Sequence, residues 1–299
     1  HTMHLVAIAR AAGIIINWDD IADLSAAVPL LARVYPNGNA DVNHFHAAGG
    51  TSCMFRQLLD AGLMHADAKT VWGECFGSFT QESFVENDKI VWRESPQKPL
   101  DMDVLTTVDH AFSSEGGIRL LAGNLGRGVI KVSAVDAEHQ IIEAPAVVID
   151  DQNQLEPLFK SGALNRDCVV VVRYQGPKAL GMPELHKLTP FLGILQDKGF
   201  KVALVTDGRM SGASGKVPAA IHLVPEAVDG GLIAKLRDGD VLRVDAISGE
   251  INCLEDMEVI NGRQASVQPK SGQRGCGREL FAVNRNNISN AEQGASYLF

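Results

Sequence analysis

Apolar residues recur at steps of three and four along the first third of the chain, which is the period of an amphipathic helix. Two helices are predicted there, over HTMHLVAIARAAG and over WDDIADLSAAVPLLARV, and Asn17 can cap the start of the second. A helical pair follows, DVNHFHAA and TSCMFRQLLDAGL, and the two glycines between them let the backbone turn where a side chain would clash. The pattern therefore predicts a helical opening to the chain.

From residue 117 the pattern changes to short apolar segments of the length of β-strands. Five segments are expected to form strands or a hairpin: RGVIKVSAV, QIIEAPAVVI, DCVVVVRY, KVALVTDG and DVLRVDAISGEIN. Helices are predicted between them, over DQNQLEPLFKSG, PELHKLTPFLGILQDKG and VPAAIHLVPEAV. The third and fourth strands are too uniformly apolar to have one face in water, so we expect them to be central and buried on both sides. This part of the chain is predicted to be mixed α/β.

A stretch of weak pattern between Lys69 and Val108 separates the helical part from the strand-rich part. Within it, SPQKPLDMD has two prolines among polar residues, which is typical of a connection between units. We therefore predict three parts: residues 1–95, residues 96–272, and a C-terminal helix with a tail over residues 273–299.

Composition and charge narrow the class of protein. The chain has 299 residues, 45% of them hydrophobic, and a formal net charge of -9 from 36 acidic and 27 basic side chains. This is the wrong sign for a protein that holds nucleic acid by bulk charge, so no nucleic acid partner is expected. No apolar run approaches the ~20 residues that span a bilayer, and the first residues lack the order of a secretory signal. We expect no membrane association and a cytoplasmic location.

The cysteines and histidines give no metal motif. The five cysteines are far apart in the sequence, at Cys53, Cys75, Cys168, Cys253 and Cys276. An odd number without a C-x-x-C pair favours neither a disulfide framework nor a self-contained zinc or iron–sulfur site. His44 and His46 are two residues apart and would not face each other on a helix, so they indicate a helix end more than a ligand pair.

The densest chemical signal is TDGRMSGASGK, residues 206–216, after an expected strand and before an expected helix. Glycines and serines in such a loop expose backbone N–H groups at a helix N-terminus, and this arrangement binds anions. The loop is not a nucleotide P-loop, because Met210 and Val217 occupy positions where that motif requires Gly and Ser or Thr. Ser211 and Ser214 can be a nucleophile, a base or helix caps, and the absence of a G-x-S-x-G elbow disfavours a covalent serine hydrolase.

The second signal is RYQGPKALGMPEL, residues 173–185, which also follows an expected strand. Its glycines and prolines predict a tight loop that leads Glu184 into the first turn of a helix. A carboxylate there is favoured by the helix dipole as a structural feature, and it can equally be an oxygen ligand for Mg²⁺. Because ligands gather at the carboxyl ends of strands in α/β proteins, both loops are candidate site loops.

At these loops the chain resembles the family of dihydroxy-acid and sugar-acid dehydratases. The resemblance runs over essentially the whole chain, in HTMHLVAIARAAG, VNHFHAAGGTSCMFRQLLDAGL, GGIRLLAGNLGRGVIKVSAV, RYQGPKALGMPEL, VTDGRMSGASGKVPAAIHLVPEA and RDGDVLRVDAISGEI. Two shorter stretches, VNHFHAAGG and RMSGASGKVPAAIH, favour the gluconate branch over the branch of branched-chain amino-acid synthesis.

The resemblance implies a hydro-lyase that dehydrates 6-phospho-D-gluconate to 2-dehydro-3-deoxy-6-phosphogluconate in the Entner–Doudoroff pathway. This chain would be its C-terminal part. Residues 1–95 would end the helical layer of an N-terminal catalytic domain, and residues 96–272 would form a β-barrel-like swivelling domain flanked by helices. The family uses Mg²⁺ and an iron–sulfur cluster whose ligands precede His1, so the chain alone is expected to be inactive. A homodimer is the expected assembly.

The resemblance also implies roles for single residues. Ser211 of DGR-x-SG matches the base that removes the substrate C2 proton, and Glu184 of GMPE matches a magnesium ligand. The residues expected to shape the loop and to offer groups to the substrate are Asp207, Gly208, Arg209, Gly212 and Ser214. Lys216 and Arg173 are candidates for the distal phosphate on charge alone. A serine hydroxyl is a very weak acid, so Ser211 would have to lose its proton beside metal charge.

Two alternatives stay open. A member of the same family could act on 2,3-dihydroxy-isovalerate or on an unphosphorylated sugar acid. A protein of a different class, a non-catalytic α/β module, could use the same glycine-rich loop to hold a phosphate-bearing ligand.

Overall fold

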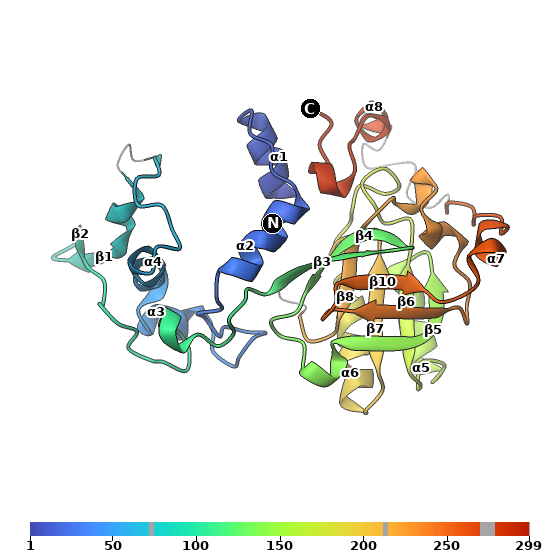
Figure 1. The fold of residues 1–299 in the computed structure, drawn as a ribbon, viewed down its shortest axis with the longest axis horizontal. Helices are drawn as coiled ribbons and strands as arrows, with labels where there is room; N and C mark the ends of the chain where they lie inside the picture. The colour runs from blue at the N-terminus through green and yellow to red at the C-terminus, as the bar shows by residue number, and fades with distance from the viewer. Residues whose placement is uncertain (72–74, 212–214, 270–278, 299) are drawn as a thin grey trace. The chain divides into compact units, whose positions relative to one another are not determined.

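The computed structural model describes residues 1–71, 75–211, 215–269 and 279–298. The chain forms two units, one of His1–Asp23 with Ile118–Phe299 and the other of Leu24–Gly117 (Figure 1). Each unit has a hydrophobic core of its own. The predicted divisions after residues 95 and 272 stay a prediction.

The larger unit is built on a closed barrel, whose eight described strands run in the order β10-β3-β4-β8-β7-β6-β5-β9. They are β3 (Ile118–Gly123), β4 (Gly126–Lys131), β5 (Ile141–Ile149), β6 (Cys168–Val172), β7 (Val202–Thr206), β8 (Ala219–Val224), β9 (Val241–Asp245) and β10 (Glu250–Cys253). The run from β5 through β6 and β7 to β8 is parallel. The prediction of a mixed α/β fold with a barrel-like body is confirmed.

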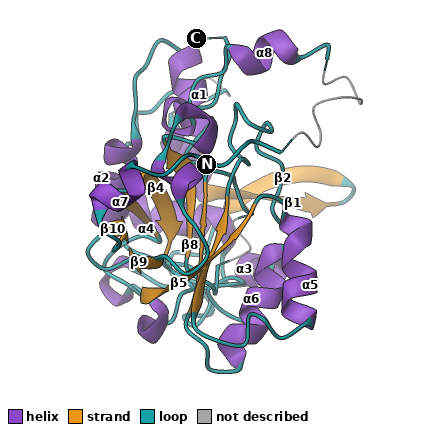
Figure 2. Ribbon diagram, turned by 90° about the vertical axis from the view of Figure 1, so that its right-hand side faces the viewer, coloured by secondary structure: helices purple, strands orange, loops and turns teal. Residues whose placement is uncertain are grey.

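Strands β6 and β7 are buried along their whole length, as their uniformly apolar sequence predicts. Successive side chains along these strands point to opposite faces and pack into two different hydrophobic cores. Val169 belongs to the cluster inside the barrel, and its neighbour Val170 belongs to a second cluster beneath α5 (Leu155–Lys160) and α6 (Leu188–Asp197). Figure 2 shows these two helices side by side. The parallel strands therefore have helices on one face and the barrel interior on the other.

The segment VPAAIHLVPEAV does not form the predicted helix, and that prediction is wrong. Residues Ala219–Val224 form β8, which pairs with β7 on one side and β4 on the other. Ala220 lies in the barrel interior and Ile221 packs outside it, which is the alternation of a strand. Hydrogen bonding along both edges outweighs the helical propensity of alanine and leucine, because a barrel closes only if this position is filled by a strand.

The N-terminal helices are α1 (His4–Ala11) and α2 (Trp18–Ala27). As predicted, Asn17 caps α2: its Oδ1 accepts the Asp20 N–H at 3.0 Å, and its own N–H donates to the Asp20 carboxylate at 2.8 Å. The helix ends before the predicted residue 34, since Pro29 disfavours a helical conformation in the residue before it.

The smaller unit contains the predicted helical pair, α3 (Val42–Ala47) and α4 (Gly50–Asp60). Between them Gly49 has a φ of 125°, a conformation that L side chains rarely adopt. The unit also has a hairpin of β1 (Gln81–Glu86) and β2 (Lys89–Glu94), which the sequence reasoning missed. The signal in the sequence was the pair Asn87 and Asp88, since these residue types tolerate the positive φ that a tight two-residue turn requires. In the structure their φ angles are 48° and 59°.

The short helices α7 (Met257–Asn261) and α8 (Ala282–Asn286) lie after the last barrel strand, in residues 254–269 and 279–298. Across the residues that the structure describes, no helix is both long and apolar enough to cross a membrane. The four described cysteines are free thiols.

The helical layer over the parallel strands should contribute much of the stability of the larger unit. Leu192 on α6 is fully buried in the second cluster, whereas Ile194 on the same helix is 44% exposed. We expect Leu192→Ala to lower the free energy of unfolding by about 2–5 kcal/mol, and Ile194→Ala by less than about 1 kcal/mol. Urea titration of both variants measures this, and equal losses would contradict the assignment of α6 to the core.

Candidate functional site

The two candidate loops lie beside each other at the carboxyl ends of the neighbouring parallel strands β6 and β7. Residues Glu184 and Arg209 form an isolated parallel bridge between the loops. The Leu185 N–H donates to the Arg209 carbonyl at 3.3 Å in the same bridge. The prediction that both loops follow strands is confirmed, and the structure brings one predicted residue from each loop into contact.

Neither loop begins a helix in the way the sequence suggested. Glu184 lies in the bridge, and α6 begins only at Leu188, so the predicted place in a first helical turn is wrong. The loop that follows Thr206 leads into strand β8, so the predicted helix after this loop is wrong as well, and the binding of an anion by the loop stays a prediction. The tertiary contact between the loops decides the conformation here, since an unpaired strand end can hydrogen-bond to its neighbour instead of starting a helix.

Glu184 and Arg209 form an ion pair, with 2.5 Å between Glu184 Oε2 and Arg209 Nη1. The Arg209 Nε also donates to the Met182 carbonyl at 2.7 Å. The other carboxylate oxygen, Glu184 Oε1, is buried and has no hydrogen-bond partner among the described residues. A buried carboxylate oxygen left in this way is unusual and suits a cation ligand.

The donor set fits Mg²⁺ in part. Mg²⁺ in proteins is commonly held by one or two carboxylates together with waters and substrate oxygens. Glu184 supplies one such oxygen, and the described residues contain no group of three or more His, Cys, Asp or Glu side chains that could hold a metal ion. Glu184 could therefore be one ligand of a magnesium site that needs further oxygens.

Asp207 lies beneath the loops and is completely buried. Its carboxylate accepts three backbone N–H groups, from Tyr174 at 3.1 Å, Gln175 at 2.8 Å and Ala227 at 2.9 Å. Burial raises the pKa of Asp207 to about 6, although these hydrogen bonds act in the opposite direction. Asp207 therefore organises the loop, and direct contact with a substrate stays a prediction.

Glu226 is a second buried carboxylate that the sequence reasoning missed. It is 1% exposed and accepts the backbone N–H groups of Lys178 at 3.1 Å and Ala179 at 3.2 Å. Burial raises the pKa of Glu226 to about 7. An acid directly after Pro225 at the end of an apolar segment was the available signal. Its contacts fix the middle of the 173–185 loop.

The glycine of the DGR sequence is required by packing. A Cβ atom on Gly208 would lie 2.6 Å from the Gln175 Cβ and 3.0 Å from Leu185 Cδ1. A side chain at this position would therefore push the two loops apart. A contact of Gly208 with substrate stays a prediction.

The remaining predicted residues differ in how far the structure describes them. Ser211 lies two residues after Arg209 and is exposed, and Lys216 is exposed further along the same loop. Gly212 and Ser214 lie outside the described residues. The proximity of Ser211 to the Glu184 carboxylate stays a prediction.

The guanidinium of Arg173 is occupied by contacts with other residues of the protein. It forms an ion pair with Asp150 at 2.5 Å and donates to the carbonyls of Ala234 at 3.4 Å and Leu236 at 3.0 Å. These contacts tie the end of β6 to the segment before β9. They give Arg173 a structural use, and its binding of a phosphate stays a prediction.

His222 is another buried polar residue close to the site that the sequence reasoning did not single out. Its backbone N–H donates to the Gly208 carbonyl at 2.9 Å, and its Nδ1 lies 3.2 Å from the Thr2 hydroxyl. It has a positive φ of 61°, where the register between β4 and β8 shifts. Such irregularities re-aim side chains in sheets and cluster near functional sites.

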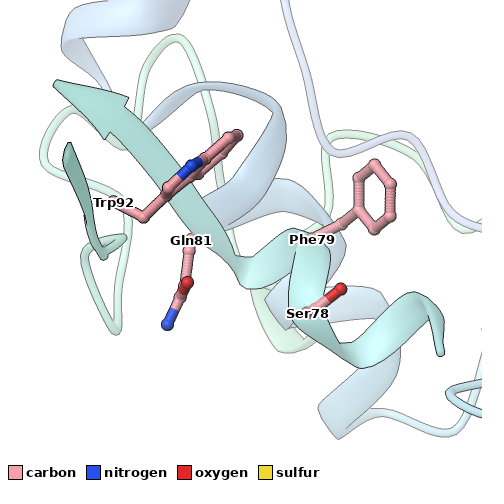
Figure 3. Close-up of a pocket in the computed structure, with 4 residues that line it drawn as sticks. All are labelled: Ser78, Phe79, Gln81 and Trp92. Atoms are coloured by element: carbon pink, nitrogen blue, oxygen red, sulfur yellow. The ribbon is translucent and has the colours of Figure 1, made fainter. Parts of the chain in front are cut away.

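A separate hollow of about 250 Å³ lies in the smaller unit. Figure 3 shows the residues that line it, Ser78, Phe79, Gln81 and Trp92, on and beside the β1–β2 hairpin. None of these four side chains is an acid, a base or a strong metal ligand at neutral pH. This hollow is therefore not a catalytic candidate.

Two family models match the chain. The model described as dihydroxy-acid/6-phosphogluconate dehydratase C-terminal matches residues 103–295, and its N-terminal counterpart matches residues 1–79. Both candidate loops fall within the first of these matches. The resemblance inferred from the sequence is confirmed.

Curated relatives are similar over nearly the whole chain. Phosphogluconate dehydratase of Pseudomonas aeruginosa is 60% identical over 295 residues, which is 99% of this chain and 48% of that protein. The Escherichia coli K12 protein of the same name is 57% identical over 297 residues, 99% of this chain and 49% of that protein. Dihydroxy-acid dehydratase of Caldanaerobacter subterraneus is 38% identical over 268 residues, 88% of this chain and 45% of that protein. The chain spans about half the length of these relatives.

The three hydrogen bonds to Asp207 should be costly to disturb. Asparagine at this position has one oxygen, and its amide would face at least one backbone N–H, leaving a buried donor unpaired. We expect Asp207→Asn to lower the free energy of unfolding by about 1–3 kcal/mol, measured by urea titration at pH 7. Asp229→Asn, which removes a half-exposed ion pair with Lys178, is the control and should cost less than about 1 kcal/mol.

His222 should make the stability depend on pH. Burial lowers the pKa of His222 to about 3, so below pH 6.5 the unfolded chain binds a proton that the folded chain does not. The stability that His222 contributes is therefore present above pH 6.5 and lost as the pH falls. We expect the difference in unfolding free energy between the unchanged protein and His222→Asn to shrink by about 1.4 kcal/mol per pH unit below 6.5. A difference that is constant between pH 7 and pH 5 would contradict this.

Proposed function

This chain belongs to the dihydroxy-acid/6-phosphogluconate dehydratase family, and from that premise we propose that it is part of a hydro-lyase that dehydrates 6-phospho-D-gluconate. The observation that carries the proposal is the difference in identity between relatives. Two named phosphogluconate dehydratase are 57% and 60% identical, and one named dihydroxy-acid dehydratase is 38% identical. The product would be 2-dehydro-3-deoxy-6-phosphogluconate.

The activity is proposed for a polypeptide of the relatives' full length, since this chain corresponds to about half of it. The other half would supply the ligands of an iron–sulfur cluster and the remaining oxygens around Mg²⁺. When bound, these groups would supply Lewis acidity at the leaving hydroxyl and positive charge at the substrate carboxylate. A homodimer and a cytoplasmic location are part of the same proposal.

The reaction removes a proton from C2 and hydroxide from C3 of the sugar acid, and the enol formed tautomerises to the 2-keto acid. Ser211 is proposed to take the C2 proton, because it is exposed at the carboxyl end of β7 on the loop that carries Arg209. Glu184 is proposed to hold the cation through its unpartnered oxygen. A cation there would lower the pKa of a nearby hydroxyl, which a serine base requires.

Other parts of the loop would bind and orient the substrate. Lys216 is exposed and is proposed to meet the distal phosphate as a mobile point charge. Asp207 and Gly208 would contribute indirectly, because their contacts within the protein hold the loop in place. Contacts of Gly212 and Ser214 with the substrate remain part of the proposal.

A second candidate substrate within the family is 2,3-dihydroxy-isovalerate or an unphosphorylated sugar acid, favoured by the relative named dihydroxy-acid dehydratase. Comparing the turnover of these acids with that of 6-phosphogluconate, in the full-length protein, separates the two. Higher kcat/KM for an unphosphorylated acid would overturn the proposed substrate.

The proposed base gives a direct test against a non-catalytic ligand-binding module. In the full-length protein we expect Ser211→Ala to lower kcat about 100- to 10,000-fold, the usual contribution of a general base. The melting temperature is measured beside kcat, so that a loss of the fold is distinguished from a loss of the base. Ser161→Ala, at another exposed serine, is the control and should retain full turnover. Unchanged turnover in Ser211→Ala would remove Ser211 from the mechanism.

A further inference from the structure

We propose that Arg209 is a positioning residue that fixes the Glu184 carboxylate so that a single oxygen, Oε1, faces the cation. This inference rests on the proposed function, because it assumes that Glu184 is a magnesium ligand. It gives Arg209 a different use from the substrate contact that the sequence suggested.

The guanidinium of Arg209 is held at two points. Its Nη1 lies 2.5 Å from Glu184 Oε2, and its Nε donates to the Met182 carbonyl at 2.7 Å. Met182 and Glu184 are both on the 173–185 loop, so one planar group contacts the carboxylate and the backbone two residues before it. The orientation of the carboxylate is therefore set relative to its own main chain.

The backbone reinforces this arrangement. Glu184 and Arg209 are partners in the bridge between the loops, and the Leu185 N–H donates to the Arg209 carbonyl at 3.3 Å. Side chains of residues paired in this way start close together, so the ion pair costs less conformational entropy than one between two free surface chains. Both side chains are partly covered, with 39% of Arg209 and 31% of Glu184 exposed.

The two carboxylate oxygens of Glu184 differ in their hydrogen bonding. Oε2 is occupied by Arg209, while Oε1 is buried without a hydrogen-bond partner among the residues that the structure describes. A carboxylate that is hydrogen-bonded through one oxygen binds a metal through the other, and such supporting contacts set the direction of the ligand. Mg²⁺ has a strict octahedral geometry, so a ligand fixed in one direction suits it.

Arginine suits this role better than lysine. The rigid fork of the guanidinium places Nε and Nη1 in fixed directions, whereas a lysine ammonium is a point charge on a flexible stem. The positive charge itself opposes a nearby cation, so an Arg209 that acted only through charge would weaken metal binding. If Arg209 orients the carboxylate, its replacement should weaken metal binding. If Arg209 acts only through its charge, its replacement by a neutral residue should strengthen metal binding.

The test measures metal binding directly in the full-length protein. Mn²⁺ is the probe, since carboxylate and water sites accept it in place of Mg²⁺, and room-temperature electron paramagnetic resonance reports the free ion. We expect Arg209→Lys, which keeps the charge and loses the fork, to raise the Kd for Mn²⁺ about tenfold. Arg209→Gln, which loses both, should also bind more weakly. Arg127→Lys changes an ion-paired arginine on β4 as the control and should keep the original Kd.

The outcomes separate this inference from the proposed function. Tighter or unchanged Mn²⁺ binding in either Arg209 variant overturns the positioning role. Glu184→Gln is measured beside them and should raise the Kd by more than either. If Glu184→Gln binds Mn²⁺ as tightly as the unchanged protein, then Glu184 is not a metal ligand and this part of the proposed function fails as well. Circular dichroism of each variant checks that the barrel is folded.

Discussion

The buried carboxylate of Asp207 accepts backbone N–H groups from Tyr174 and Gln175 after β6 and from Ala227 after β8, while Asp207 itself follows β7. One side chain thus joins the carboxyl ends of three neighbouring strands. The N–H groups would otherwise be buried without partners, and the carboxylate would be a buried charge without compensation. The N–H groups and the carboxylate can therefore be buried only together. The position of the loop that carries Arg209 and Ser211 follows from this junction.

Barrel closure is what brings these groups together. Because β6 and β7 are parallel and adjacent, the loops after them leave the sheet at the same edge and can form the bridge between Glu184 and Arg209. β8 then runs parallel to β7 and closes the barrel against β4. A helix in place of β8 would leave two strand edges unpaired.

Much of this fold could be predicted from local sequence. The uniformly apolar β6 and β7, the Asn17 cap and the turn at Gly49 each depend on a few neighbouring residues, and each was predicted correctly. The strand β8 could not be predicted from local sequence, because it pairs with residues that are far away in the sequence. For the same reason the site was predicted only in outline. The two loops were identified, but the Glu184–Arg209 contact and the burial of Glu226 arise from tertiary packing.

The three acids around the loops differ in how completely their oxygens are satisfied. Both oxygens of Asp207 and both oxygens of Glu226 accept a backbone N–H, and both carboxylates are buried, so neither has an oxygen without a partner. Glu184 is more exposed than either, yet it keeps one buried oxygen without a partner among the described residues. Burial alone would rank Glu184 last as a functional acid. Its unfilled hydrogen-bonding capacity ranks it first, because a cation needs an oxygen that the protein has positioned and has not used.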